Sequence, residues 1–113
     1  MYKEIDNMLS VLEGYLLEDA DHVGKQIAND FRHRRVEKGL TREKIAERAG
    51  VAVSNVVRFE QKGLISLKNL IRLATALGYA SEIKSLFATP KYSTMEELTQ
   101  IRKNSGKTKA YKK

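Results

Sequence analysis

Residues 39–63 read GLTREKIAERAGVAVSNVVRFEQKG, and the spacing of their glycines and apolar residues predicts two short helices joined by a tight turn. Thr41 is expected to cap the first helix, which would bury Ile45 and Ala49 at positions i and i+4. Gly50 permits the left-handed conformation at which helices commonly end. The chain can therefore reverse its direction here within a few residues.

The second helix is expected over residues 52–61, after Val51 has entered the core. Its inward side chains would be Val56 and Phe59. The opposite face is narrow enough to enter a DNA major groove. That face consists of Val53, Ser54, Val57 and Arg58.

This stretch resembles the helix-turn-helix of the lambdoid phage repressor family, also called the XRE family. The family pattern contains Leu-Thr-Gln, a Leu-Ala pair, Gly-Val-Ser, a hydrophobic residue and Glu-x-Gly. The resemblance covers about residues 23–87 and implies an all-α fold. The expected architecture is a five-helix repressor-like domain with an extra N-terminal helix, a short C-terminal helix and a basic tail. The matching residues are Leu40, Thr41, Ile45, Ala46, Gly50, Val51, Val56 and Glu60.

The resemblance also implies roles for individual residues. Arg58 is expected to pair with O6 and N7 of a guanine, and Val53 to meet a thymine methyl group. The family pairs an arginine and a glutamate at the positions of Arg35 and Glu60, which are interpreted as a structural ion pair. The implied base-reading residues are Ala52, Val53, Ser54, Val57 and Arg58. The candidates for phosphate contacts are Arg42, Asn55, Gln61 and Lys68, with Arg102, Lys103, Lys107 and Lys109 in the tail.

Two positions depart from the family pattern. Arg42 stands where the family usually has a glutamine that touches phosphate and braces the recognition helix. Arg42 can still hold phosphate by its charge, without the bracing between two amides. Ala52 replaces a helix-capping serine, which should weaken the start of the second helix by about 1 kcal/mol.

The net charge of +7 is unevenly distributed. Residues 1–21 contain six acidic side chains and one lysine, whereas residues 22–62 contain ten basic and five acidic ones. Residues 102–113 contain six basic side chains and no acidic one. Around this motif, such charge favours phosphate neutralisation over a merely solvated surface. The tail can wrap DNA as a flexible arm, bind an acidic partner, or remain a solvated end.

Helices are expected almost throughout the chain. An acidic amphipathic helix over 3–18 is interpreted as a packing helix, with dimerisation or partner binding as the alternative. A helix over 22–38 is expected to bury four apolar side chains. The predicted domain division is 1–21, 22–88 and 89–113. The four side chains are Val23, Ile27, Phe31 and Val36.

Three further segments complete the expected fold. Ser66 would cap a helix that Gly78 ends, and residues 81–88 would form a short helix of the kind that helps lambdoid repressors to dimerise. A last short helix would run to Ile101, and the segment from residue 102 onward is expected to be disordered when free. Its capping box would be either Ser93 with Glu96 or Thr94 with Glu97.

No motif supports catalysis. His22 and His33 have no HExxH or Cys-rich context, and the chain contains no cysteine and no GxGxxG, GxxxxGK[ST] or GxSxG sequence. The sequence therefore predicts no enzyme, no metal or cofactor, and no small-molecule ligand. With no apolar run of about 20 residues and no signal peptide, no membrane segment is expected. The expected location is cytoplasmic, and nucleoid-associated when DNA is bound.

Three functional hypotheses follow. The first is a homodimeric, DNA-binding repressor that is also the antitoxin of a toxin-antitoxin operon, since the whole chain is similar to HipB-type antitoxins, whose partner is a HipA-like kinase toxin. The second is a phage or host repressor without a toxin partner. The third is a protein-interaction module that no longer reads DNA. The first two predict double-stranded DNA as a partner, with a dimer on an inverted repeat.

Overall fold

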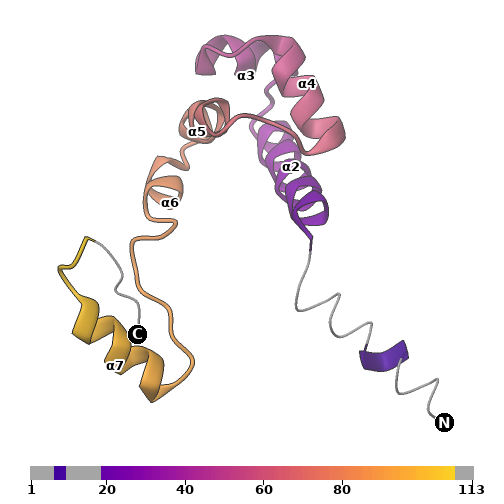
Figure 1. Cartoon of the computed structure of the whole chain (residues 1–113). Coiled ribbons are helices and arrows are strands. Elements are labelled where there is room, and N and C mark those ends of the chain that lie inside the picture. The colour runs from indigo at the N-terminus through magenta and orange to yellow at the C-terminus, as the bar shows by residue number, and fades with distance from the viewer. Residues whose placement is uncertain (1–6, 10–18, 109–113) are drawn as a thin grey trace. The chain divides into compact units, whose positions relative to one another are not determined.

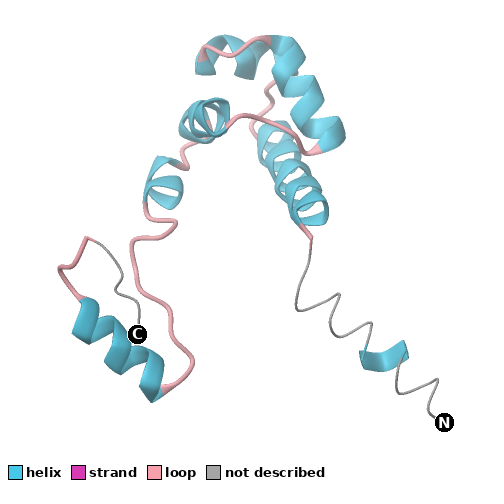
Figure 2. Ribbon diagram, viewed as in Figure 1, coloured by secondary structure: helices cyan, strands magenta, loops and turns pink. Residues whose placement is uncertain are grey.

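The computed structural model describes residues 7–9 and 19–108, which form helices and connecting loops without any strand (Figures 1 and 2). The expected all-α class is confirmed for these residues. The helix expected over 3–18 lies outside them, except for residues 7–9. The helices are α2 (Ala20–Glu37), α3 (Arg42–Ala49), α4 (Val53–Lys62), α5 (Leu67–Ala76), α6 (Ala80–Lys84) and α7 (Met95–Asn104).

The chain divides into two compact units, residues 1–80 and residues 81–113. Helices α2 to α5 belong to the first unit and α7 belongs to the second. The domain division expected from the sequence, with boundaries after residues 21 and 88, stays a prediction.

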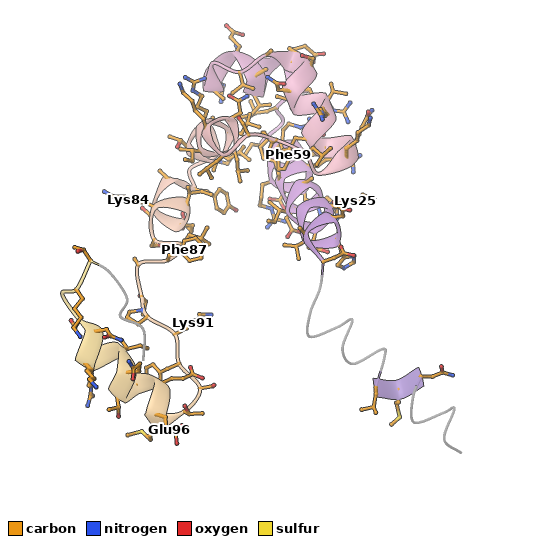
Figure 3. The ribbon with its side chains drawn as sticks, viewed as in Figure 1. Lys25, Phe59, Lys84, Phe87, Lys91 and Glu96 are labelled. Carbon is orange, nitrogen blue, oxygen red and sulfur yellow. The ribbon has the colours of Figure 1, made fainter. Side chains whose placement is uncertain are left out.

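The core of the first unit lies among α2, α3, α4 and α5. Phe31 of α2 and Phe59 of α4 have ring centroids 5.3 Å apart, and Figure 3 labels Phe59 where α4 meets α2. Helix α3 packs against both α4 and α5, so the two helices of the motif share one apolar interior. The buried apolar side chains are Ala28, Phe31, Leu40, Ile45, Ala46, Val51, Val56, Phe59, Leu73 and Leu77.

The turn between α3 and α4 forms as the sequence predicts. Thr41 Oγ1 accepts a hydrogen bond from the backbone N–H of Lys44 at 3.0 Å, which caps α3. Gly50 ends α3 with a φ of 68°, in the left-handed region, and Val51 is buried immediately after it. Ala52 precedes α4 without a side-chain cap. The cap at Thr41, the left-handed Gly50 and the buried Val51 therefore determine where α3 begins and ends and how the chain turns into α4.

The buried face of α2 differs from the expected one. Val23, Ile27 and Val36 were predicted to be buried, but they are 37%, 44% and 54% exposed. Phe31 is buried as expected, and the other inward residues of α2 are Ala28 and Arg35. Periodicity in the large apolar residues is misleading here, because the true face contains a small side chain and a charged one.

Helix α5 follows its expected pattern closely. Ser66 Oγ accepts a hydrogen bond from the backbone N–H of Asn69 at 3.2 Å. Leu73 and Leu77 are buried, and Gly78 follows with a φ of 92°. The prediction of a helix capped by Ser66 and ended near Gly78 is confirmed.

The helix expected over residues 81–88 is shorter in the structure. Helix α6 covers Ala80–Lys84, and none of its residues is buried. Leu86 and Phe87, expected on that helix, lie beyond it and are 65% and 92% exposed. A single helical turn without buried contacts has little to extend it, because short helices depend on packing for their stability.

Helix α7 is capped by Thr94, as in the second of the two predicted arrangements, but Glu97 bonds the N–H of Ser93 and not that of Thr94, so the predicted box is half formed. Thr94 Oγ1 accepts from the N–H of Glu97 at 3.1 Å, and Glu97 Oε2 accepts from the N–H of Ser93 at 3.1 Å. The helix continues to Asn104, so residues 102–104, which were expected to be disordered, are helical. Arg102 and Lys103 lie in the last turn, where their positive charge interacts favourably with the negative end of the helix dipole, and this favours the extension.

Helices α2 and α4 approach each other through two glycines. A Cβ on Gly63 would lie 2.7 Å from the backbone carbon of Gly24, and a Cβ on Gly24 would lie 2.8 Å from the carbonyl oxygen of Gly63. Both distances are shorter than a Cβ atom can approach another heavy atom without a bond. The neighbouring atoms belong to the backbone, so they cannot move aside as a flexible side chain could. The absence of two side chains is therefore what allows the end of α4 to rest on α2.

This contact generates a prediction for two matched variants. Gly39 and Gly63 have the same φ of 69°, but a Cβ on Gly39 would meet nothing within 4 Å. We expect Gly39→Ala to lower the free energy of unfolding by about 1–2 kcal/mol through backbone strain alone. Gly63→Ala should lose about 1–3 kcal/mol more, because it also forces α2 and α4 apart. Urea denaturation followed by circular dichroism tests this, and equal losses would contradict it.

Candidate nucleic-acid interface

The face of α4 that points away from the core carries four of the residues expected to reach bases, and the fifth, Ala52, is the residue that precedes the helix. They lie opposite the buried Val56 and Phe59. The structure therefore places these side chains on one side of a single helix, although their contact with bases stays a prediction. Exposed on this face are Ala52, Val53, Ser54 and Arg58, with Val57 half-buried.

No side chain caps or neutralises the positive N-terminal end of α4 from within its first turn. Ala52 provides no side-chain cap, and the first turn contains no acidic residue. The first N–H groups of a helix lack partners within the helix, and they carry its positive end. The positive end of α4 therefore lies next to Val53 and Ser54 without a side-chain cap and without an acidic residue in the first turn.

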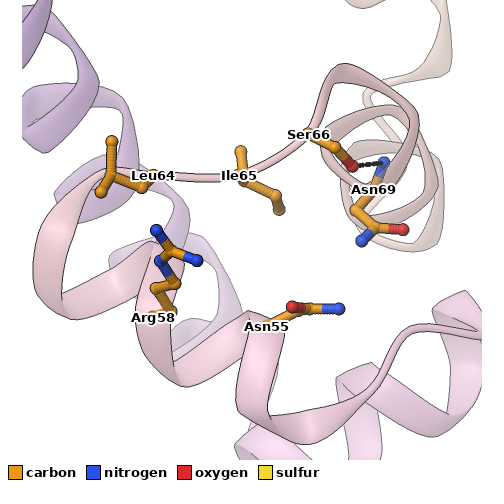
Figure 4. Close-up of a pocket in the computed structure, with 6 residues that line it drawn as sticks. All are labelled: Asn55, Arg58, Leu64, Ile65, Ser66 and Asn69. Carbon is orange, nitrogen blue, oxygen red and sulfur yellow. Dashed lines mark hydrogen bonds between the residues drawn. The ribbon is translucent and has the colours of Figure 1, made fainter.

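A hollow of about 390 Å³ lies between α4 and the start of α5 (Figure 4). Asn55 and Arg58 reach it from α4, while Ser66 and Asn69 line it from the start of α5. The structure thus brings together one expected phosphate residue, Asn55, and one expected base reader, Arg58. Ser66 is recognisable from the sequence as a cap, whereas its place on the wall of this hollow, with Asn69, depends on how α4 and α5 pack.

The remaining expected phosphate residues of the first unit are spread over the surface. Lys68 is exposed in the first turn of α5, next to Asn69. Gln61 is exposed in the last turn of α4, at the opposite end of that helix from Val53. Lys68 therefore lies near the hollow, whereas Gln61 does not line it.

A buried carboxylate holds the motif together. Arg35 of α2 donates from Nε to Glu60 Oε2 at 2.7 Å and from Nη2 to Glu60 Oε1 at 2.9 Å. Its Nη1 donates to the carbonyl oxygen of Leu40 at 2.8 Å. The Glu60 side chain is 0% exposed and that of Arg35 is 9% exposed. The ion pair that the family resemblance implies is thus present as a two-pronged contact between α2 and α4.

Arg42 joins this pair from α3. Its Nε donates to Glu60 Oε1 at 3.0 Å, and its side chain is 33% exposed. Arg42 was expected to contact phosphate, and its contact with α4 was not expected. The arginine at this position therefore does brace α4, through a carboxylate.

The two arginines determine the protonation of Glu60. Burial alone would raise the pKa of this carboxyl, but hydrogen bonds and charge from Arg35 and Arg42 outweigh it and hold the pKa below its ordinary value of 4.5. Because the folded-state pKa is the lower one, ionised Glu60 stabilises the fold above the pKa of the unfolded chain. That contribution is lost as the pH falls toward the folded-state pKa.

The basic residues of the second unit lie at the end of α7 and beyond it. Arg102 and Lys103 are exposed in the last turn of α7. Lys107 Nζ donates to Asn104 Oδ1 at 3.3 Å, and Lys109 lies outside the described residues. A role for these four side chains at phosphate stays a prediction.

Other kinds of site are not found within residues 7–9 and 19–108. These residues contain no group of three or more His, Asp or Glu side chains placed to hold a metal ion. None of their helices combines the length and apolar character that crossing a membrane requires. His22 and His33 both lie exposed on α2.

The geometry defines a helix-turn-helix, with a capped first helix, a glycine turn and a second helix whose outer face is open. Residues 31–83 match the helix-turn-helix family model HTH_3. This match covers just under half of the chain and supports the XRE family. It indicates DNA-binding regulation of transcription, in a family that is typically non-enzymatic. No curated protein matches the chain.

The ion pair yields a second prediction. Arg35→Ala leaves Glu60 buried with one partner fewer, and we expect the free energy of unfolding to fall by about 3–5 kcal/mol. Arg34→Ala is the matched control, because Arg34 forms only an exposed pair with Glu37 at 3.0 Å. That change should stay within about 0.5 kcal/mol. Similar losses for the two variants in urea denaturation would show that the buried pair is not structural.

Proposed function

We propose that this protein is a sequence-specific transcriptional repressor that binds DNA as a homodimer on an inverted repeat. The observation that carries the proposal is the outer face of α4, which is free of core contacts and lies beside a hollow lined by Arg58 and Asn55. A rigid helix with such a face suits the major groove. The family match supports the DNA-binding part of the proposal.

In this proposal the residues of the motif divide into readers and anchors. Arg58 pairs with a guanine, which is worth roughly 1–3 kcal/mol of discrimination, and Val53 contacts a thymine methyl. Ala52, Ser54 and Val57 complete the reading face. Phosphates are held by Arg42, Asn55, Gln61 and Lys68 and, in the basic C-terminal segment, by Arg102, Lys103, Lys107 and Lys109.

The homodimer is proposed on geometric grounds. One α4 reads too few bases for useful specificity, so two copies should bind half-sites about 34–36 Å apart. Leu86 and Phe87 are large, apolar and exposed, and they follow α6, the fifth helix of the proposed repressor-like arrangement α2 to α6. Burying these two side chains against a second copy would remove apolar surface from water.

The finer identity that we propose is the antitoxin and autoregulator of a HipBA-like operon, with a HipA-like kinase toxin as its partner. What supports it is the resemblance noted from the sequence, namely a repressor-like core followed by a short C-terminal helix and a basic end. A kinase-like reading frame beside the gene is expected. Its absence would favour a phage or host repressor without a toxin.

A protein-interaction module that no longer reads DNA is the other candidate. The observation in its favour is that Val53 on the outer face of α4 is 37% exposed, with Val57 half-buried beside it. Apolar side chains there can dock a protein as well as a thymine methyl. The exposed Arg58 on the same face favours DNA.

A gel-shift titration against the region upstream of the gene, with random duplex as competitor, tests the DNA-reading function. Wild type should bind saturably and resist the competitor, whereas Arg58→Ala should lose about 10- to 100-fold in affinity for its site. Arg48→Ala removes an equal charge from an exposed position on α3 and should bind nearly as wild type. Equal binding to every duplex would contradict sequence reading.

Sedimentation tests the dimer. The free protein should sediment as a dimer at micromolar concentration, and Phe87→Asp should shift it toward monomer, because a charge at a buried apolar contact is costly. Met95→Asp, at another exposed apolar position, serves as the control and should leave the dimer intact. Wild type that is monomeric both alone and on its operator would refute the dimer.

A further inference from the structure

The hydrogen bonds of the two arginines at Glu60 are unequal. All three nitrogens of the Arg35 guanidinium donate to protein acceptors, two bonds going to Glu60 and one to the carbonyl of Leu40. Arg42 donates only from Nε. Among the described residues, its Nη1 and Nη2 have no acceptor. Because the Arg42 side chain is one-third exposed, these N–H groups are the donors that it can offer to a ligand.

The charges of the cluster are also unbalanced. Two guanidinium groups share one carboxylate, so one positive charge is left over. Arg35 and Glu60 are buried, whereas the side chain of Arg42 is one-third exposed. An anion from solution can therefore contact the excess positive charge of this cluster only at Arg42.

We infer that Glu60 is a positioning residue that holds Arg42 so that its two outer nitrogens clamp one DNA backbone phosphate. The inference rests on the proposed function. A guanidinium can do this because it is a rigid plane with donors on more than one edge. Nε stays on the carboxylate while Nη1 and Nη2 form the paired contact with phosphate oxygens.

The arrangement has a direct consequence for binding. A free arginine side chain loses much of its rotamer freedom when it is fixed on a phosphate. Arg42 is already held by the α4 carboxylate before DNA arrives, so less freedom remains to be lost. Since Glu60 lies on the recognition helix itself, the phosphate contact and the position of α4 become linked.

Binding of a duplex that carries the operator, measured over a range of salt concentrations, tests the phosphate contact. Arg42→Ala should weaken binding about 10- to 100-fold and reduce the slope of log affinity against log salt by about 0.9, the amount expected for one phosphate. Arg42→Lys keeps the charge but offers a single nitrogen, so it should keep the slope and still lose affinity. Arg48→Ala is the control and should change neither quantity.

The positioning role needs a double-mutant cycle. If Glu60 acts through Arg42, then Glu60→Gln should weaken binding in wild type and have a much smaller effect in the Arg42→Ala background. Circular dichroism establishes that each variant is folded at the temperature used. If Glu60→Gln does not fold, Arg42→Lys decides the matter, because full affinity in that variant would overturn the clamp.

The outcomes separate this inference from the function on which it rests. Operator binding by wild type, with an unchanged salt slope in Arg42→Ala, would overturn the phosphate clamp and leave the repressor proposal standing. An equal effect of Glu60→Gln with and without Arg42 would overturn the positioning role alone. Wild type that binds no duplex would overturn the proposed function and the clamp together.

Discussion

The buried carboxylate of Glu60 is the constraint on which the motif depends. An ionised carboxylate is too costly to bury unless charged or hydrogen-bonding partners surround it. Those partners come from two other helices, Arg35 from α2 and Arg42 from α3, so the carboxylate is satisfied only when α2, α3 and α4 are in their correct relative positions. Arg35 also binds the carbonyl of Leu40, which fixes the loop into α3. Hydrophobic burial drives collapse of the same helices, but it is less directional than this cluster.

The anchors of α4 are unevenly placed along the helix. Glu60 is held by the arginines, and Gly63 rests on Gly24, so the C-terminal half is fixed by polar contacts and by close backbone packing. The N-terminal half has no side-chain cap and is held mainly by the apolar plugs Val51 and Val56. Of the proposed reading face, Ala52, Val53, Ser54 and Val57 lie at this less anchored end, and Arg58 lies just beyond it. The side chains proposed to read bases therefore contribute little to the stability of the fold, so they can be replaced without unfolding the protein.

Local signals in the sequence predicted the elements well, and long-range contacts account for the rest. Thr41, Gly50 and Ser66 act through neighbours within a few residues, so caps and turns could be predicted directly. The inward face of α2 could not, because Ala28 and Arg35 are inward only in relation to α4. The brace from Arg42 was missed for the same reason, since its acceptor lies eighteen residues away. The pairing of Arg35 with Glu60 came from the family resemblance and not from any local pattern.

The replacement of a glutamine by Arg42 changes how salt acts on the motif. A hydrogen bond between two amides joins neutral groups, whereas the Arg42–Glu60 contact joins opposite charges. Salt would screen the attraction between these charges if both were exposed. The side chain of Glu60 is fully buried, however, so screening is weak at its contact with Arg42 and stronger where the one-third exposed Arg42 side chain meets solvent. Rising salt should therefore weaken the proposed phosphate contact long before it loosens α4. The motif can in this way combine a fold that tolerates salt with an affinity for DNA that responds to it.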